Sequence, residues 1–102
     1  MSTLNIVNKS PYEKRTLDQC LSRIGAGDAV LLIEDAVVVA AAGTSYDDEL
    51  QSVGADKKLY VLSADLEARG LAEKPLVKGF SAVDYEGFVA LVVEHDRVHS
   101  WL

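Results

Sequence analysis

Apolar residues fall along the chain in short runs that are typical of β-strands. Residues 3–8 alternate between apolar and polar positions, and residues 97–101 show the same alternation. Residues 28–34 instead contain a continuous apolar run, the pattern of a central parallel strand that is covered on both faces. Further strands are predicted over residues 59–62, 76–78 and 80–83.

Two segments between these runs have the apolar period of an amphipathic helix. Residues 11–24 follow Ser10, which forms a capping box with Glu13, and residues 85–95 follow Asp84 as an N-cap. The apolar stripes are Leu17, Cys20, Leu21 and Ile24 in the first helix and Tyr85, Phe88, Val89 and Val92 in the second. Both stripes are expected to pack against the sheet.

Three shorter helices are predicted between the strands. In residues 36–42, after Asp35, consecutive valines favour a strand, while the alanines and the following glycine favour the short buried helix that we predict. A capping box of Ser45 and Asp48 opens a helix that ends at Gly54, and residues 64–69 form the third.

Strands that alternate with helices predict an α/β fold. We expect one domain over residues 1–102, with about five strands in a mainly parallel sheet and helices around it. Only the helices over 11–24 and 85–95 are long and clearly amphipathic, whereas a parallel sheet needs cover on both faces. We therefore expect a partner subunit to complete the cover.

Composition and charge exclude several classes of protein. The 102 residues carry a formal net charge of −6, which repels phosphate backbones and anionic lipids and argues against direct binding to nucleic acid or a membrane. A single cysteine cannot form an internal disulfide. The start of the chain lacks the pattern of a signal peptide, and no apolar run approaches the about 20 residues that span a bilayer, so a cytoplasmic location is expected.

Cys20 is the chain's strongest candidate for covalent chemistry. Its thiolate is an effective nucleophile, but the residue lies on an apolar stripe and far from the helix N-terminus that lowers thiol pKa values. Cys20 is therefore either a small buried hydrophobic residue or a reactive, sulfur-carrying thiol. Both interpretations stay open on local sequence.

No metal or cofactor site is predicted. His95 and His99 are separated by a helix-to-strand break and lack further ligands, so they do not form a zinc pair. Gly25 and Gly27 end a helix, whereas a dinucleotide-binding turn would open one.

Four stretches in order resemble one known family. They are residues 8–12 (NKSPY), 27–35 (GDAVLLIED), 60–71 (YVLSADLEARGL) and 83–89 (VDYEGFV), with a chain end near Trp101. The chain is similar to the DsrH/TusB family of sulfur-relay proteins over nearly its full length.

The resemblance implies a subunit of a cytoplasmic heterohexamer with a DsrEFH-like fold. Its partners would be DsrE-like and DsrF-like (TusD-like and TusC-like) subunits and a DsrC/TusE-like sulfur acceptor. Such complexes relay persulfide sulfur for dissimilatory sulfur oxidation in the Dsr branch and for 2-thiolation of a tRNA wobble uridine in the Tus branch. The principal persulfide cysteine belongs to the DsrE/TusD chain, so that role does not transfer to this chain.

The resemblance makes Cys20 the residue that distinguishes the branches. DsrH-like chains carry a cysteine in this helix and TusB-like chains typically lack one, so the chain is expected to be closer to DsrH, with Cys20 as a candidate persulfide carrier. The alternatives are a non-catalytic structural subunit and a TusB-like subunit. We expect the isolated chain to be inactive.

Overall fold

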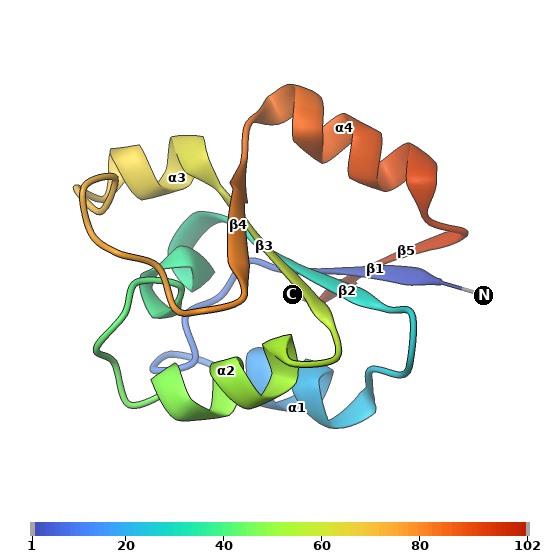
Figure 1. Ribbon diagram of the computed structural model, residues 1–102, viewed down its shortest axis with the longest axis horizontal. Coiled ribbons are helices and arrows are strands. Elements are labelled where there is room, and N and C mark those ends of the chain that lie inside the picture. Colours follow the sequence, from blue (N-terminus) through green and yellow to red (C-terminus); the bar gives the residue numbers. More distant parts are fainter. Residues whose placement is uncertain (1, 102) are drawn as a thin grey trace.

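Strands and helices alternate along the computed structural model, which describes residues 2–101 (Figure 1). The strands are β1 (Thr3–Val7), β2 (Ala29–Leu32), β3 (Lys58–Leu62), β4 (Phe80–Val83) and β5 (Arg97–Trp101). The helices are α1 (Thr16–Arg23), the 3-10 helix η1 (Glu34–Val39), α2 (Asp47–Gly54), α3 (Ser63–Ala68) and α4 (Tyr85–Glu94). Met1 and Leu102, which belong to the predicted domain, lie outside the described residues.

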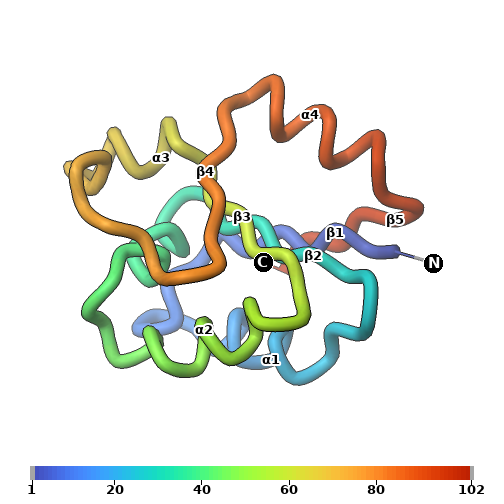
Figure 2. Tube along the Cα trace, in the orientation of Figure 1, coloured from blue at the N-terminus to red at the C-terminus, as the bar shows by residue number. Residues whose placement is uncertain are grey.

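The five strands form one parallel sheet in the order β4-β3-β2-β1-β5, which confirms the predicted fold class. The chain adds strands outward from β1 to β4, and α4 then carries it back across the sheet to β5 (Figure 2). Val7 at the end of β1 is level with Leu32 of β2 and Trp101 of β5. The carboxyl ends of the strands therefore share one edge of the sheet.

The sheet has two buried faces that are covered unequally. Side chains alternate along β1, so Val7 belongs to one core cluster, while Leu4 and Ile6 belong to the other. The first cluster includes residues of α1, η1, α2 and α3. In the second cluster Leu91 of α4 is the only buried helical residue among those described, and Figure 1 shows α4 on the opposite side of the sheet from α1 and α2.

The first helix is shorter than predicted, because it begins at Thr16. The predicted capping box is wrong: the Ser10 carbonyl accepts bonds of 3.0 Å from the N–H groups of Glu13 and Lys14, which closes an isolated turn. The side chains over residues 12–15 are exposed. A helical turn here would bury no apolar surface, and short helices depend on such burial for stability.

The segment after β2 is buried and helical as predicted, but it is a 3-10 helix over Glu34–Val39, without a side-chain cap from Asp35. The predicted cap at Ser45 is also wrong. The Tyr46 N–H instead donates to Thr44 Oγ1 at 3.2 Å, and α2 begins at Asp47. Residues 76–78 form no strand, since Leu76 makes only an isolated antiparallel bridge with Ala41.

Helix α4 is capped as predicted but faces the sheet differently. The Asp84 carboxylate accepts a 2.8 Å hydrogen bond from the Gly87 N–H. Leu91 is buried, with Phe88 and Val92 partly buried beside it, whereas Tyr85 and Val89 of the predicted stripe are exposed. Because residues 88–93 are all apolar, the sequence pattern does not select one face of this helix. No helix among residues 2–101 has both the length and the apolar composition to cross a membrane.

Gly87 lets the first turn of α4 approach β4. A Cβ atom at this position would lie 2.9 Å from the Cβ of Val83. We expect Gly87→Ala to lower the free energy of unfolding by about 1 kcal/mol, because overpacking outweighs the gain in helix propensity. Urea denaturation measures the change. Gly25→Ala is the control, since its nearest neighbour would be 3.8 Å away, and equal effects of the two substitutions would contradict the prediction.

Candidate functional site

Cys20 lies on the side of α1 that faces the sheet. Its side chain is fully buried in the first core cluster together with Leu17 of the same helix and Val30 and Leu32 of β2. Burial, and to a smaller extent the negative charge of Asp28, raises the pKa of the Cys20 thiol from 9.0 to about 12. At pH 7 a thiol with this pKa is ionised in roughly 10⁻⁵ of the molecules.

This position has a direct chemical consequence. Sulfur transfer needs a thiolate that reaches a sulfane sulfur, and in this structure Cys20 is neither ionised nor accessible. Arg23, three residues after Cys20 in α1, carries a positive charge but is exposed. The sequence correctly places Cys20 on a packing stripe, and its role as a persulfide carrier stays a prediction.

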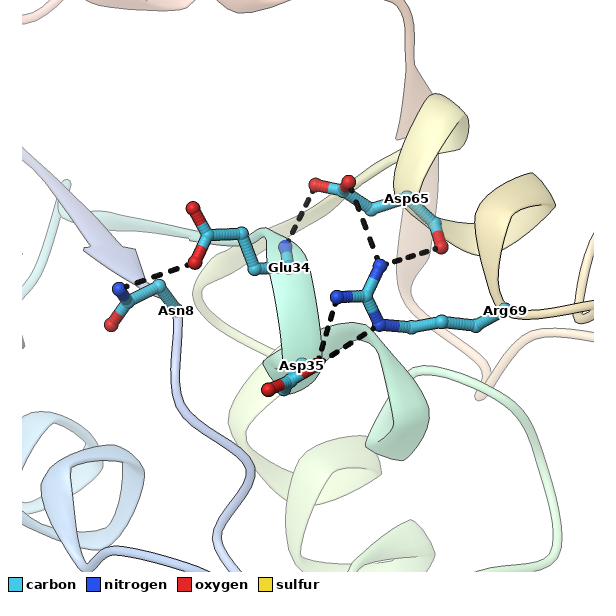
Figure 3. A network of polar contacts seen from close by, with 5 residues as sticks. All are labelled: Asn8, Glu34, Asp35, Asp65 and Arg69. Atoms are coloured by element: carbon cyan, nitrogen blue, oxygen red, sulfur yellow. Dashed lines mark hydrogen bonds and ion pairs between the residues drawn. The ribbon is translucent and has the colours of Figure 1, made fainter.

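A second group of polar residues lies at the carboxyl edge of the sheet, where ligands often bind in open α/β folds (Figure 3). Arg69, after α3, contacts both Asp35 of η1, with Nη2 2.8 Å from Oδ1, and Asp65 of α3, with Nη1 3.6 Å from Oδ1. Asp65 also accepts a 2.7 Å hydrogen bond from the backbone N–H of Glu34. These contacts tie the end of β2 to α3.

Glu34 holds a strained backbone at the centre of this group. Its φ is +50°, and among the described residues it is the only non-glycine with a positive φ. Left-handed backbone is unfavourable for a residue with a Cβ, by roughly 1–2 kcal/mol. The hydrogen bond to Asp65 holds the N–H of Glu34 in this conformation, which turns the chain directly from β2 into η1.

Asn8 extends the group to the end of β1. Its Nδ2 donates to Glu34 Oε2 at 3.5 Å, a weak contact, and its buried Oδ1 has no hydrogen-bond partner among the described residues. Figure 3 shows Asn8 and Glu34 facing each other from neighbouring strand ends, with Asp65 and Arg69 on the other side of Glu34. The exposed Glu34 carboxylate can accept hydrogen bonds from a partner, but this group contains no thiol that could carry sulfur.

The thiol and the carboxyl-edge group are separate. Asp28, the charge that acts on Cys20, precedes β2, and Glu34 follows it, so the two acids lie about 20 Å apart along the strand direction. In the sequence, Glu34 and Asp35 are simply two adjacent acidic residues after a predicted strand. Their link to Asp65 and Arg69 becomes visible only in the fold, because these residues are 31–34 positions apart.

The two histidines lie in different environments. His95 ends α4 with its Nδ1 2.8 Å from the carbonyl oxygen of Leu91, whereas His99 of β5 stacks on Trp101 with ring centroids 4.4 Å apart. Trp101 in turn donates through Nε1 to Oδ1 of the buried Asn5 at 3.1 Å. No group of three or more potential metal ligands occurs in the described part of the chain.

Comparison with known proteins identifies the family. The family described as DsrH like protein matches residues 9–98. The chain belongs to the DsrH/TusB family. Protein TusB of Pectobacterium parmentieri is 37% identical, with 96% of this chain and 99% of the relative covered, and Protein TusB of Escherichia coli O81 is 33% identical at the same coverage.

Solved structures support the fold of this DsrH/TusB-family chain. The ychN protein of Escherichia coli superposes with a TM-score of 0.80 at 19% identity, covering 98% of this chain and 99% of that one. A protein of unknown function from Methanobacterium thermoautotrophicum superposes with a TM-score of 0.72 at 14% identity, covering 96% of each chain. At these identities the likeness concerns the fold alone.

The buried thiol makes the stability of this family member pH-dependent at alkaline pH. The native thiol stays neutral up to a pKa of about 12, while the unfolded thiol ionises near 9. Stability from this group is complete below pH 9 and is lost toward pH 12. Relative to Cys20→Ala, the wild type should lose about 1 kcal/mol of unfolding free energy per pH unit above pH 9. Urea denaturation of both proteins from pH 8 to 11 measures this difference, and parallel pH profiles would contradict it.

The strain at Glu34 predicts a stabilising substitution. Glu34→Gly removes the Cβ that disfavours a positive φ, and we expect it to raise the unfolding free energy by about 0.5–1 kcal/mol despite the greater entropy of unfolded glycine. Glu34→Ala, which keeps the Cβ, controls for loss of the carboxylate. Thermal and urea denaturation should rank Gly above Ala, and the opposite order would show that the backbone is not strained.

Proposed function

We propose that this chain is a structural, non-catalytic subunit of a TusB-type sulfur-relay complex. Its partners are TusC-like and TusD-like (DsrF-like and DsrE-like) chains in a heterohexamer. The complex passes persulfide sulfur to a TusE/DsrC-like acceptor for 2-thiolation of a tRNA wobble uridine. In this complex the persulfide cysteine belongs to the TusD-like chain, and the complex is cytoplasmic.

The branch of the family rests on the relatives. Curated relatives from Pectobacterium, Photorhabdus and Escherichia that align over nearly the whole chain are named Protein TusB. The presence of Cys20 is the one feature that favours the Dsr branch and sulfur oxidation instead. Full-length similarity to TusB proteins outweighs one residue, because that residue is packed as a hydrophobic side chain.

The main support for a structural role is the burial of Cys20, the only thiol in the sequence. A carrier has to meet both a donor and an acceptor, and each encounter needs an exposed sulfur with an accessible thiolate. Cys20 meets neither condition. Adding a sulfur atom to Cys20 would require α1 to separate from β2, and this separation would expose the largest core cluster.

The uneven cover of the sheet supports an assembled state. In this sheet α4 alone contributes helical residues to the core cluster of one face. Strands of parallel sheets are normally buried on both faces. The net charge of −6 favours contact with proteins over direct contact with tRNA. The tRNA would therefore be reached through other proteins of the relay.

The second candidate keeps Cys20 as a carrier in a DsrEFH-type complex for dissimilatory sulfur oxidation. In that step the Cys20 thiolate attacks the outer sulfur of a partner persulfide, which forms Cys20–S–SH and releases the partner cysteine as a thiolate. No external oxidant or reductant is needed. The position of Cys20 in the first helix, where DsrH-like chains have a cysteine, is the observation that favours it.

Mass spectrometry of the assembled complex separates the two candidates. After exposure to a polysulfide donor, we expect the TusD-like chain to gain about 32 Da per added sulfur while Cys20 stays unmodified. The Cys20→Ala complex should load and deliver sulfur to the TusE-like acceptor at the wild-type rate. Alanine is preferred to serine because a buried hydroxyl would need a hydrogen-bond partner.

A control shows that Cys20 can be detected. Denaturing the unloaded complex should make Cys20 react fully with iodoacetamide, whereas the native complex should leave it unreacted. A sulfur adduct on native Cys20, together with slow delivery by the Cys20→Ala complex, would replace the structural role with the carrier role. Failure of the wild-type chain to form a complex with these partners would overturn both.

A further inference from the structure

The outer side of α4 exposes large apolar side chains. Tyr85, Val89 and Val93 are 63%, 61% and 79% exposed, and they are spaced four residues apart. At 1.5 Å per residue they form a stripe about 12 Å long on one side of the helix. We call these three residues the α4 face. Single exposed apolar residues are common, but a continuous stripe on one helix marks an interaction surface.

Packing within the chain does not account for this stripe. The side of α4 that holds the helix on the sheet carries Phe88, Leu91 and Val92. Figure 1 shows no other element of the chain over the outer side of α4. Val98 of β5, which pairs with Leu4 on the same side of the sheet, is also 45% exposed.

The charged residues of α4 and of the positions that directly flank it are all negative. Residues 84–96 include Asp84, Glu86, Glu94 and Asp96 and contain no lysine or arginine. Glu86 and Glu94 are exposed near the two ends of the stripe. The surface is therefore an apolar strip with an acidic rim.

This charge pattern disfavours two possible occupants. If two copies of α4 packed together along this stripe, each copy would bring acidic residues and no basic residue of its own helix toward the other, in either orientation. Like charges at an interface oppose association. The same acidic rim is repelled by anionic lipid headgroups.

We propose that the α4 face docks a different protein chain, through an apolar surface on that chain that is flanked by lysine or arginine. The inference rests on the proposed function, because it assigns this contact to one of the two partner subunits in the relay complex. The partner's apolar side chains cover Tyr85, Val89 and Val93. Its basic residues pair with Glu86 and Glu94.

Matched tyrosine substitutions test the surface in the co-expressed complex. Tyr85 and Tyr12 are both 63% exposed, but Tyr12 lies in the turn before α1 and contacts Tyr46. We expect Tyr85→Ala, and also Val89→Glu at the centre of the stripe, to weaken binding of the chain to its partners at least about tenfold. Tyr12→Ala should bind as the wild type does. Circular dichroism and thermal denaturation of each isolated variant check that the fold is intact.

The rim has its own test. Binding of the wild type should weaken as salt increases, because exposed ion pairs are screened. In the double variant Glu86→Gln with Glu94→Gln, this dependence should be smaller. An unchanged salt dependence would overturn the basic-partner part of the inference.

The remaining outcomes separate the inference from the proposed function. If the wild type assembles and both Tyr85→Ala and Val89→Glu assemble equally well, the α4 face is not the interface and the proposed function stands. If the wild type does not assemble with these partners, both fail. If sedimentation equilibrium shows that the isolated chain forms a dimer that Val89→Glu disrupts, the occupant is a second copy and the inference is wrong.

Discussion

A parallel sheet buries side chains on both of its faces, and the structure of this chain depends on how its helices divide between them. Four helices contribute to the cluster that contains Val7, Val30 and Leu32, whereas α4 alone covers Leu4, Ile6 and Leu31. This division follows from chain order, since the connections between β1 and β4 all supply helices to the first cluster and only the last connection crosses the other face. The outer side of α4 consequently stays apolar and uncovered.

The same division decides the chemistry of the only cysteine. Cys20 lies under α1 on the well-covered face, so the packing that stabilises the fold also removes the thiol from water and raises its pKa. Stability and thiol reactivity are opposed at this position, because ionisation would place an uncompensated charge in the largest core cluster. A structural subunit needs no reactive thiol, so burial of Cys20 stabilises it without loss of function.

The carboxyl edge of the sheet shows where the fold retains strain. The left-handed backbone at Glu34 is held by Asp65, which Arg69 connects in turn to Asp35. This network joins β2, η1 and α3 at the edge where the parallel strands end (Figure 3). It is a polar surface connected by hydrogen bonds and ion pairs beside the exposed Glu34 carboxylate, at the end of β2 that follows Leu32.

Strands and helix starts that depend on neighbouring residues in the chain were predictable from the sequence. The continuous apolar run gives β2, alternation gives β1 and β5, and the Asp84 cap starts α4, because each depends on neighbours within a few residues. Local signals misled where packing decides. The capping boxes at Ser10 and Ser45 matched a helix start, yet α1 begins only at Thr16, next to the buried Leu17, and α2 begins at Asp47.

Composition and periodicity by themselves determined one acidic α/β domain with a parallel sheet, a single thiol on a packing stripe and too few amphipathic helices to cover both faces. Only the tertiary structure decided which side of α4 meets the sheet, how deeply Cys20 is buried and which acids surround Arg69. Residues 88–93 are apolar all round, so their orientation is selected by contact with Leu4, Ile6 and Leu31. The Arg69 network likewise joins residues more than thirty positions apart, a separation that no local pattern encodes.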